Sequence, residues 1–450
     1  MAVWNTIPTS RLVGASRLDA EFWHPTYVAS EAAIRVNNHA PLGSLVSVFK
    51  KGIFYILARE YSPAGIPFYR SSNVGAVLPK EDGLTFITEA KHRQERKTAL
   101  VRGDMMMVKT GRSGASVILR DNCNVSQDVV AIKLKPGRVN PYYLAVYLNT
   151  AYGSSEMNRW FQGQVQPHLS LNDARRIWVS LPSSDEQQKV ERMVLSSANT
   201  RDEAARAWLD AQHLLESQLG LDNLTFQKPV GYMARFSKVP LSHTFSARRV
   251  DAQCFAPDAL FYEQAFSRRG GCESLAYLLD AAVKGRQHEE VSSGTADYCT
   301  IKHISGRELA NVSRCLPMKG TQFAQREDLL LAITGATIGK VGIVKRYSRL
   351  AFSGDLLQLK VNKDVNPYYL LLVLDHSVGQ IQFNRWITGS TNGHLAPRDA
   401  GRVLVPRLKP EAEKRIGALV AESLSKRVES ERLLAQAKQR VEELIEQAVK

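Results

Sequence analysis

The most constraining feature of the sequence is an internal duplication. Residues 1–20 align without a gap on residues 233–252, and the segment Asn-Pro-Tyr-Tyr-Leu begins at Asn140 and again at Asn366. The matching blocks follow the same order in each half. This repeat is far longer than the period of about 20 to 50 residues in solenoids and propellers, so the repeated unit is a whole domain with its connector. Two similar domains on one chain indicate a target with two similar parts.

Size and charge narrow the nature of that target. A chain of 450 residues with 44% hydrophobic content can bury two separate cores. The formal net charge of +15 and the pI near 9.6 favour an anionic partner, with nucleic acid ahead of an acidic membrane surface. A basic protein that binds no polyanion specifically is the alternative. The positive excess lies in the two repeated parts, because residues 184–218 are acidic and residues 410–450 are balanced.

Cysteine usage and the N-terminal segment indicate the compartment. The five cysteines are odd in number and never form a Cys-x-x-Cys pair, which argues against a disulfide framework or a cysteine-rich zinc site. The first residues lack the pattern of a secretory signal, and no stretch reaches the length of a membrane span. We therefore expect a cytoplasmic protein with reduced thiols and no membrane association.

Each half begins with short apolar runs and continues with helical patterns. In the first half we predict strands at 45–49, 53–57, 105–109, 115–120 and 129–134, because turn residues separate these runs. Asn140 and Asn366 then each precede a proline, and this pair is typical of a helix N-cap and first helical position. Strands followed by helices predict an α+β domain in each half.

A long polar stretch with an apolar stripe follows each predicted domain. The spacing of the stripes predicts two helices of about 50 to 60 Å. We expect them to pair as a coiled coil, which two equivalent units permit only if the helices are antiparallel; burial of each stripe against its own domain is the alternative. The predicted domains are residues 1–183 and 233–409, the helices residues 184–220 and 410–450, and the linker residues 221–232.

Several paired motifs support a resemblance to a known family. They are Arg17–Ala20 with Arg249–Ala252, Thr110–Gly111 with Thr334–Lys340, Ser126–Asp128 with Ser353–Asp355, and the two Asn-Pro-Tyr-Tyr-Leu segments. Together with the long helices, this order resembles the DNA-specificity (S) subunit of type I restriction-modification systems over essentially the whole chain. The first half departs from the pattern after Gly111, where the second half reads Thr-Gly-Ala-Thr-Ile-Gly-Lys.

The resemblance implies a non-catalytic subunit with two tandem target recognition domains, each of which reads one half of a split sequence in double-stranded DNA. The long helices would separate these domains and dock two methyltransferase (modification) subunits that use S-adenosylmethionine. Restriction subunits that use ATP would join the same complex. Neither cofactor would bind this chain.

The motifs of an enzyme are missing from the sequence. The Asn-Pro-Tyr-Tyr segments resemble the loop that holds adenine in methyltransferases, but Tyr replaces the second Pro and no glycine-rich cofactor turn is present. Walker A, His-Glu-x-x-His and Gly-x-Ser-x-Gly are also missing. We therefore predict that the chain is not an enzyme; a stand-alone nucleic-acid-binding scaffold and, less favoured, an adenine methyltransferase are the alternatives.

Candidate DNA contacts lie in loops beside turns, where side chains can reach phosphates or base edges. In the first half they are Lys50, Lys51, Arg70, Ser71, Asn73, Lys109, Arg112, Gln164, Gln166 and His168. In the second half they are Lys284, Arg286, Gln287, His288, Lys302, His303, Lys340, Thr391, Asn392 and His394. Any one of these could instead be an ordinary solvated loop residue.

Other duplicated residues have structural explanations. His168 and His394 match one another, but no second ligand stands at metal-binding spacing. We expect Asp19 and Asp251 to form a salt bridge or a turn cap, and Trp160 and Trp386 to anchor the cores. Residues 53–95 and 286–325 resemble each other little, although they occupy matching places. Unlike reading surfaces on a repeated scaffold predict an asymmetric bipartite DNA site.

Overall fold

The structure is a computed structural model of the chain, and it divides into two compact units. Unit 1 comprises Met1–Arg201 and Arg427–Lys450, and unit 2 comprises Asp202–Lys426. The described residues are 3–12, 17–111, 113–163, 165, 167–221, 224, 226, 229–233, 252–269, 271–305, 307–309, 311–389 and 392–449. Both divisions fall inside a long helix, whereas the predicted domains end at residues 183 and 409; those boundaries stay predictions. Residues 222, 223, 225, 227 and 228 of the predicted linker lie outside the described residues.

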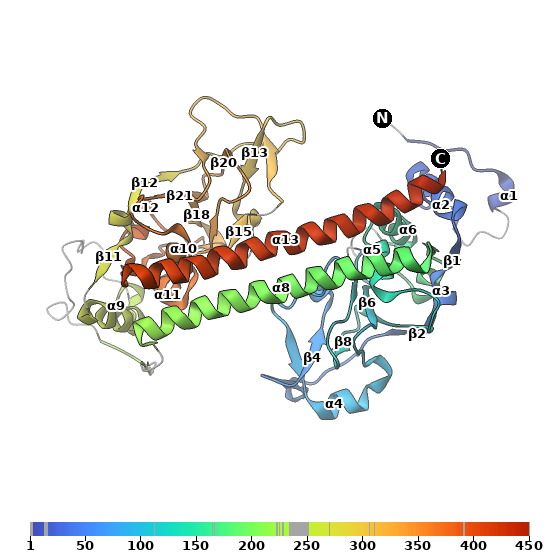
Figure 1. The fold of residues 1–450 in the computed structure, drawn as a ribbon, viewed down its shortest axis with the longest axis horizontal. Coiled ribbons are helices and arrows are strands. Elements are labelled where there is room, and N and C mark those ends of the chain that lie inside the picture. Colours follow the sequence, from blue (N-terminus) through green and yellow to red (C-terminus); the bar gives the residue numbers. More distant parts are fainter. Residues whose placement is uncertain are drawn as a thin grey trace. The chain divides into compact units, whose positions relative to one another are not determined.

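Unit 1 is an α+β structure with two four-stranded sheets (Figure 1). The main sheet has the order β2-β9-β6-β7 and is antiparallel throughout. Its strands are β2 (Val46–Lys51), β6 (Met105–Val108), β7 (Ala115–Val117) and β9 (Val129–Leu134). The second sheet is built from β3 (Tyr61–Ser62), β4 (Ile66–Tyr69), β5 (Thr85–Ile87) and β8 (Asn124–Val125), and β4 pairs with β8 in parallel. A further pair joins β1 (His39–Pro41) to β10 (Trp178–Ser180).

Short helices complete unit 1. They are α1 (Thr9–Leu12), α2 (Pro25–Val36), α3 (Leu42–Leu45), α4 (Glu89–Gln94), α5 (Pro141–Leu148), α6 (Ala151–Trp160) and α7 (Leu171–Ala174), with the 3-10 turns η1 (Ala58–Glu60), η2 (Ser71–Asn73) and η3 (Arg96–Thr98). The predicted N-cap of α5 is confirmed, because the Asn140 side chain accepts hydrogen bonds from the backbone N–H groups of Tyr142 and Tyr143. The predicted strand at 53–57 is wrong beyond Ile53, which makes a single bridge to Ser126.

The main sheet of unit 1 is covered on both faces. All four residues of β6 are buried, and successive side chains of a strand point to opposite faces. Met105 and Met107 therefore join the core on the side of α5 and α6, whereas Met106 and Val108 join a separate core toward the second sheet. In Figure 1, α5 and α6 lie on one side of β6, and β4, β8 and α4 lie on the other.

Unit 2 repeats the order and antiparallel pairing of the main sheet with β12-β21-β18-β19, to which β15 and β14 are added. These strands are β12 (Leu279–Lys284), β14 (Ile304–Ser305), β15 (Glu308–Leu309), β18 (Leu329–Ala332), β19 (Val341–Ile343) and β21 (Leu356–Val361). A second sheet contains β13 (Ala296–Cys299), β16 (Ser313–Cys315), β17 (Phe323–Ala324) and β20 (Leu350–Phe352), and β11 (Cys272–Ser274) pairs with β22 (Leu404–Pro406).

The helices of unit 2 follow the same plan. They are α9 (Pro257–Arg269), α10 (Pro367–Asp375), α11 (Ser377–Trp386) and α12 (Pro397–Ala400), with the 3-10 turns η6 (Ala252–Phe255), η7 (Leu275–Leu278), η8 (Ile301–His303) and η9 (Gly335–Thr337). Asn366 caps α10 as predicted, through hydrogen bonds to the backbone of Tyr368 and Tyr369. The Thr-Gly-Ala-Thr-Ile-Gly-Lys segment forms η9 and the turn between β18 and β19.

Two long helices contribute to both units, α8 (Ser184–Leu219) and α13 (Pro410–Val449). Within unit 1, Arg440 forms an ion pair with Glu186 at 2.8 Å, and Ser197 and Ser430 exchange hydrogen bonds at 2.8 and 2.9 Å. Residue numbers rise along α8 as they fall along α13, so these two segments run in opposite directions.

In each unit the apolar stripes of both helices join the globular core. Val190, Val194 and Ala198 of α8 lie in the same cluster as Ala437, Val441 and Ile445 of α13 and the residues of α5. In unit 2, Trp208, Ala211, Leu215, Leu219, Ile416, Val420 and Leu424 join α10 and β18 in the same way. Within each unit, the stripes of both helix segments therefore share one core with the globular part, and the coiled coil over the length of the helices stays a prediction.

The described members of the duplicated residue pairs have structural roles. Arg17 pairs with Asp19 at 2.7 Å, and the Asp19 carboxylate caps a turn by accepting from the backbone of Phe22 at 3.0 Å. The guanidinium of Arg17 holds the pKa of Asp19 below its ordinary value. Trp160 and Trp386 are both buried in their cores, as predicted. Asp251 lies outside the described residues.

Candidate nucleic-acid interface

In unit 1, three strand ends and one loop meet at an edge of the main sheet. Lys51 ends β2, Lys109 follows β6, and Asp128 precedes β9. The backbone N–H of Lys109 donates to the carbonyl of Asp128 at 2.9 Å, and the backbone N–H of Leu169 donates to the carbonyl of Lys109 at 2.9 Å. A further bridge joins Thr110 to His168. Predicted contacts far apart in the sequence thus lie on one edge.

The electrostatics of this edge favour an anion. Burial, and then the positive charge of Lys51, lower the pKa of Lys109, while Asp128 opposes this shift. Burial, and then Lys109 and Lys51, lower the pKa of His168. Lys51 therefore lies within Coulombic reach of Lys109 and His168, and a bound phosphate would offset the repulsion between the two lysines. We hereafter call the group of Lys51, Lys109 and His168 the basic edge of unit 1.

Unit 2 builds the corresponding edge with different chemistry. The Thr334 hydroxyl donates to the Asp355 carboxylate at 2.7 Å, and a bridge joins Thr334 to His394. The backbone N–H of Ile333 donates to the carbonyl of Asp355 at 3.0 Å, so buried Ile333 stands where unit 1 has Lys109. Lys284 at the end of β12 is exposed. The matching edge therefore keeps the Thr, Asp and His residues of unit 1 but has buried Ile333 in place of the Lys109 cation.

A glycine after the edge strand of each unit permits a close backbone approach. A Cβ atom at Gly52 would overlap the carbonyl oxygens of Val125 and Ser126. A Cβ atom at Gly285 would overlap those of Phe352 and Ser353. Glycine is required here by space, because neither residue has positive φ. These two positions carry the chain from the shared scaffold into the unlike segments that follow.

The structure separates the predicted contacts into groups. Those with exposed or partly exposed side chains are Lys50, Lys51, Arg70, Ser71, Lys109, His168, Lys284, Arg286, Gln287, Lys302, Lys340, Asn392 and His394. Among them, Arg286 donates to the carbonyl of Lys319 at 2.9 Å, and Lys302 pairs with Glu290 at 2.6 Å. Arg112, Gln164, Gln166 and Thr391 lie outside the described residues.

Three predicted contacts have buried side chains. Asn73 is 1% exposed, accepts from the backbone of Arg70 and donates to the carbonyls of Lys80 and Asp82. His288 packs edge-on against Tyr298, and His303 accepts from the backbone N–H of Thr300 at 2.9 Å. Burial lowers the pKa of both histidines. We therefore exclude these three residues from the interface, since they stabilise the loops that carry it.

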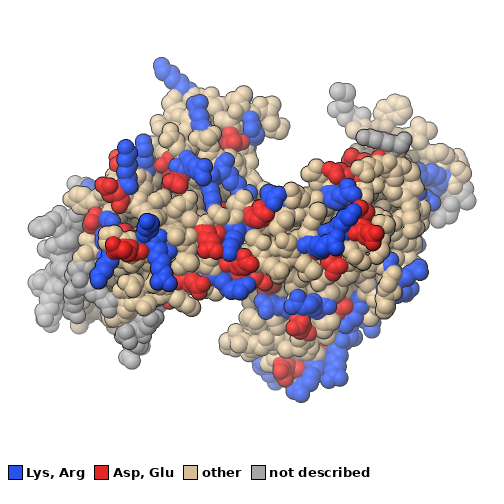
Figure 2. Space-filling view, in the orientation of Figure 1, with Lys and Arg blue, Asp and Glu red and all other residues tan. Residues whose placement is uncertain are grey.

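Sequence reasoning missed two exposed groups in unit 1. Arg93 of α4 and Arg96 and Lys97 of η3 are exposed, and Figure 2 shows Lys and Arg side chains gathered over this part of the unit. The charge run at residues 91–97 was the available signal. Phe54 and Tyr55, between β2 and η1, are also exposed. No sequence signal distinguished them, because their run was interpreted as a strand.

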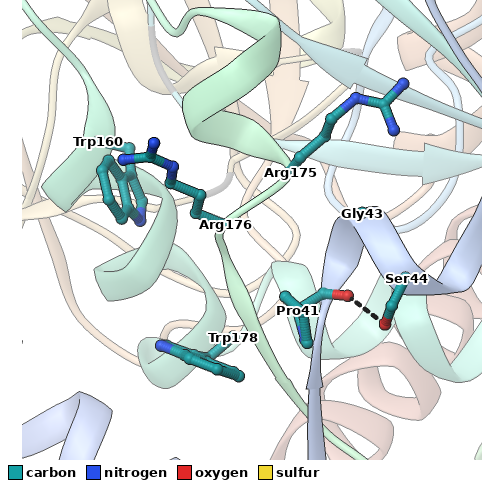
Figure 3. A pocket seen from close by; sticks show the side chains of 7 residues that line it. All are labelled: Pro41, Gly43, Ser44, Trp160, Arg175, Arg176 and Trp178. Carbon is teal, nitrogen blue, oxygen red and sulfur yellow. Dashed lines mark hydrogen bonds between the residues drawn. The ribbon is translucent and has the colours of Figure 1, made fainter. Parts of the chain in front are cut away.

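A hollow of about 580 Å³ in unit 1 contains none of the predicted contacts. Its lining consists of Pro41, Gly43, Ser44, Trp160, Arg175, Arg176 and Trp178 (Figure 3). The Arg176 guanidinium lies over the Trp160 ring at 5.7 Å, and the Ser44 hydroxyl donates to the carbonyl of Pro41 at 2.7 Å. These contacts hold α6 and α3 beside the strand pair of β1 and β10.

No cluster of three or more His, Cys, Asp or Glu residues with metal-binding geometry occurs among the described residues. None of the helices in the described part of the chain is long and apolar enough to cross a membrane.

Comparison with known proteins gives one family match. Residues 39–194 match the type I restriction modification DNA specificity domain, and this match confirms the resemblance inferred from the motifs. Comparison with the curated proteins finds no match. Among solved structures, the type I restriction-modification S subunit from M. genitalium is similar at 11% identity and a TM-score of 0.44, with 91% of this chain and 95% of that chain covered. The HsdS subunit from Thermoanaerobacter tengcongensis is similar at 14% identity and a TM-score of 0.29, with 91% and 96% covered.

Proposed function

We propose that the whole chain is the DNA sequence-specificity subunit of a type I restriction-modification system, because residues 39–194 match the DNA specificity domain of that family. The family match carries this proposal. The basic edge lies within the matched residues and gives the phosphate-binding chemistry that DNA recognition requires. The scaffold protein and the adenine methyltransferase are not favoured by the match.

We further propose that units 1 and 2 contain two tandem target recognition domains that read an asymmetric bipartite site. The repeated strand order, the paired N-caps and the paired glycines support a common scaffold. The unlike edges support different half-site sequences. In this proposal α8 and α13 form an antiparallel coiled coil that sets the spacing between the half-sites, supported by the opposed segments within each unit.

The partners follow from the same proposal. The chain would direct two methyltransferase subunits, which bind S-adenosylmethionine, and restriction subunits, which use ATP, to the DNA site. We propose no cofactor for this chain. The exposed faces of α13 would form part of the docking surface for the methyltransferase subunits.

Selection from a random duplex library tests the proposed function. The full chain is used with and without the methyltransferase subunit encoded beside it, and recovered sequences are aligned. A split motif with a fixed gap is the expected result. Salt-sensitive binding that enriches no motif in either condition would contradict it and favour the general nucleic-acid-binding alternative.

Docking of the methyltransferase subunit on α13 is best tested by substitutions, not by truncation of the helix. Ile416, Val420 and Val441 are buried in the two cores, so deleting α13 would damage both units. Ala418 and Ala435 are exposed on the same helix. Replacing each with Arg adds bulk and charge without touching a core, and should weaken capture of the methyltransferase subunit while the melting temperature stays unchanged. Capture equal to that of the wild type by both variants would contradict docking at these faces.

A further inference from the structure

Unit 1 displays two neighbouring aromatic side chains next to its basic edge. Phe54 is 74% exposed and Tyr55 is 66% exposed. Single exposed apolar residues are common on protein surfaces, but an adjacent pair of this size leaves a large apolar area in water. The pair follows the last cation of β2 by three residues.

The backbone on both sides of the pair is fixed. Gly52 lies against the carbonyls of Val125 and Ser126, and Ile53 is buried with its backbone N–H donating to the carbonyl of Val125 at 2.8 Å. On the other side, Ile56 packs against the small core of Ile66, Phe68 and Ile87. The loop is therefore anchored at both ends, and the two aromatic rings project from a supported position.

The positive charge around the aromatic pair favours DNA as its partner. The Lys51 ammonium lies 4.8 Å from the centre of the Phe54 ring, and its charge also lowers the pKa of Lys109 and of His168. Arg70 lies over the ring of Tyr61, which is itself partly exposed. A protein surface that covered the pair would have to match this positive charge, whereas DNA supplies phosphates beside stacked bases.

Unit 2 lacks the aromatic pair at the matching place. The backbone N–H of Arg286 donates to the carbonyl of Phe352 just as that of Ile53 donates to the carbonyl of Val125. Phe54 and Tyr55 therefore correspond to Gln287, which is exposed, and His288, which is buried. One unit presents apolar rings after its edge strand, and the other presents an amide.

Resting on the proposed DNA-specificity function, we propose that Phe54 and Tyr55 form a wedge that enters a base step of the half-site bound by unit 1. Apolar side chains in such a position partly unstack the step and kink the duplex. Pyrimidine–purine steps unstack most easily, so the half-site of unit 1 carries a TA or CA/TG step there. Unit 1 then reads part of its half-site through DNA deformability.

The test uses the full chain with its methyltransferase subunit and the selected duplex, with 2-aminopurine placed in turn at the adenines of each half-site. Wild-type protein should raise the fluorescence at one step of the unit 1 half-site. The double variant Phe54→Ala/Tyr55→Ala should lose that signal and bind about 5- to 150-fold more weakly, the range for removing aromatic stacking on a base. Tyr277→Ala, a tyrosine 76% exposed at η7 of unit 2, is the matched control and should change neither readout.

A second duplex separates the wedge from a simple binding contact. With a mismatch at the responsive step, the unstacking is already present, and the affinities of the wild type and the double variant should lie within about twofold of each other. An equal loss of affinity on both duplexes without any change in fluorescence would overturn the wedge. So would loss of the methyltransferase subunit with intrinsic DNA binding unchanged, which would place the pair in a protein interface.

Different results contradict the proposed function and the proposed wedge. A wild-type complex that selects no sequence contradicts both. A complex that selects a split motif but leaves 2-aminopurine unchanged at every adenine of the unit 1 half-site contradicts the wedge alone.

Discussion

Unit 1 carries a carboxyl group at Glu156 where unit 2 carries an amide at Gln382. Both residues occupy the sixth position of corresponding helices, α6 and α11. Gln382 accepts from the backbone N–H of Leu404 at 2.7 Å and donates to its carbonyl at 3.0 Å. Glu156 accepts from the backbone N–H of Trp178 at 3.3 Å, but its second oxygen is buried without a hydrogen-bond partner. The polar side chain is thus hydrogen-bonded at both ends in unit 2, whereas in unit 1 one carboxylate oxygen is buried with only the Arg159 guanidinium nearby, at 3.8 Å.

The strand edges of the two units differ as well. Unit 1 gathers cations at Lys51 and Lys109, whereas unit 2 has Ile333 at the second of these places. The two units therefore differ at an interior position as well as at the surface. Matched substitutions in the two units show which positions have the same role in both units and which have a role in one unit alone.

The largest effect is expected at the paired glycines. Gly52→Ala should lower the stability of unit 1 by about 3 kcal/mol, because the added methyl group overlaps two carbonyl oxygens and the backbone must move. Gly285→Ala should do the same to unit 2. Thermal unfolding and binding to duplexes with one scrambled half-site measure both losses. Gly231→Ala is the control, since nothing lies within 4 Å of its Cβ position; equal loss at both half-sites from either variant would contradict separate scaffolds.

The buried carboxyl group gives the next effect. Burial raises the pKa of Glu156 from an ordinary value of 4.5 to about 7. The folded state therefore binds this proton more tightly than the unfolded chain, and stability falls as the pH rises from about 4.5 to 7 and stays low above. Glu156→Gln should stabilise the protein by about 2 kcal/mol at pH 8 and have little effect near pH 4.5. Urea unfolding at both pH values measures this, and Gln382→Glu in unit 2 should produce the reverse change; a pH-independent gain would contradict the titration.

A smaller effect is expected at the basic edge. Lys109→Ala should reduce the slope of log affinity against log salt concentration by about 0.9, the contribution of one phosphate contact. Lys135→Ala is the control, because Lys135 follows the opposite end of β9 and bonds to the carbonyl of Ser44. Binding titrations at several salt concentrations measure the slope. An unchanged slope for Lys109→Ala would remove this lysine from the interface.

The smallest effect concerns one turn. Gly103 has φ of 86° in unit 1, and Glu327 holds the corresponding place in unit 2 with φ of 72°. A left-handed conformation costs a non-glycine residue about 1 to 2 kcal/mol, and Glu327→Gly also loses a 3.3 Å hydrogen bond from Tyr368. The net result should be a stabilisation of about 0.5 kcal/mol. Gly103→Glu should destabilise unit 1, and thermal melting compares the two; a melting temperature lowered by Glu327→Gly would mean that the Tyr368 contact outweighs the backbone strain.

Local signals explain which parts of the fold were predictable. The Asn-Pro pairs at residues 140 and 366 cap helices through their own neighbours, and the run at 105–108 lies in the predicted strand. The run at 53–57 has the composition of a strand, but the close approach at Gly52 turns the chain out of the main sheet. The course of the chain at residues 53–57 is therefore set by tertiary packing and not by local strand propensity.

The candidate site was predictable as a set of loops, not as a set of side chains. Lys51, Lys109 and His168 do converge on one edge. Asn73 and His303 have residue types suited to base contacts, but their side chains satisfy the backbone of 3-10 turns. The same residue types can cap a turn or contact a base. Whether the side chain bonds to its own backbone or faces solvent is decided by the folded loop.

The make-up of the two cores has a consequence for synthesis on the ribosome. Unit 2 is continuous from Asp202 to Lys426, so all its residues emerge in one run. Unit 1 is not, because Ala437, Val441 and Ile445 belong to its core. Although most of unit 1 is translated first, its core stays open until this late segment has left the exit tunnel. The second unit to be translated is thus the first that can complete its fold.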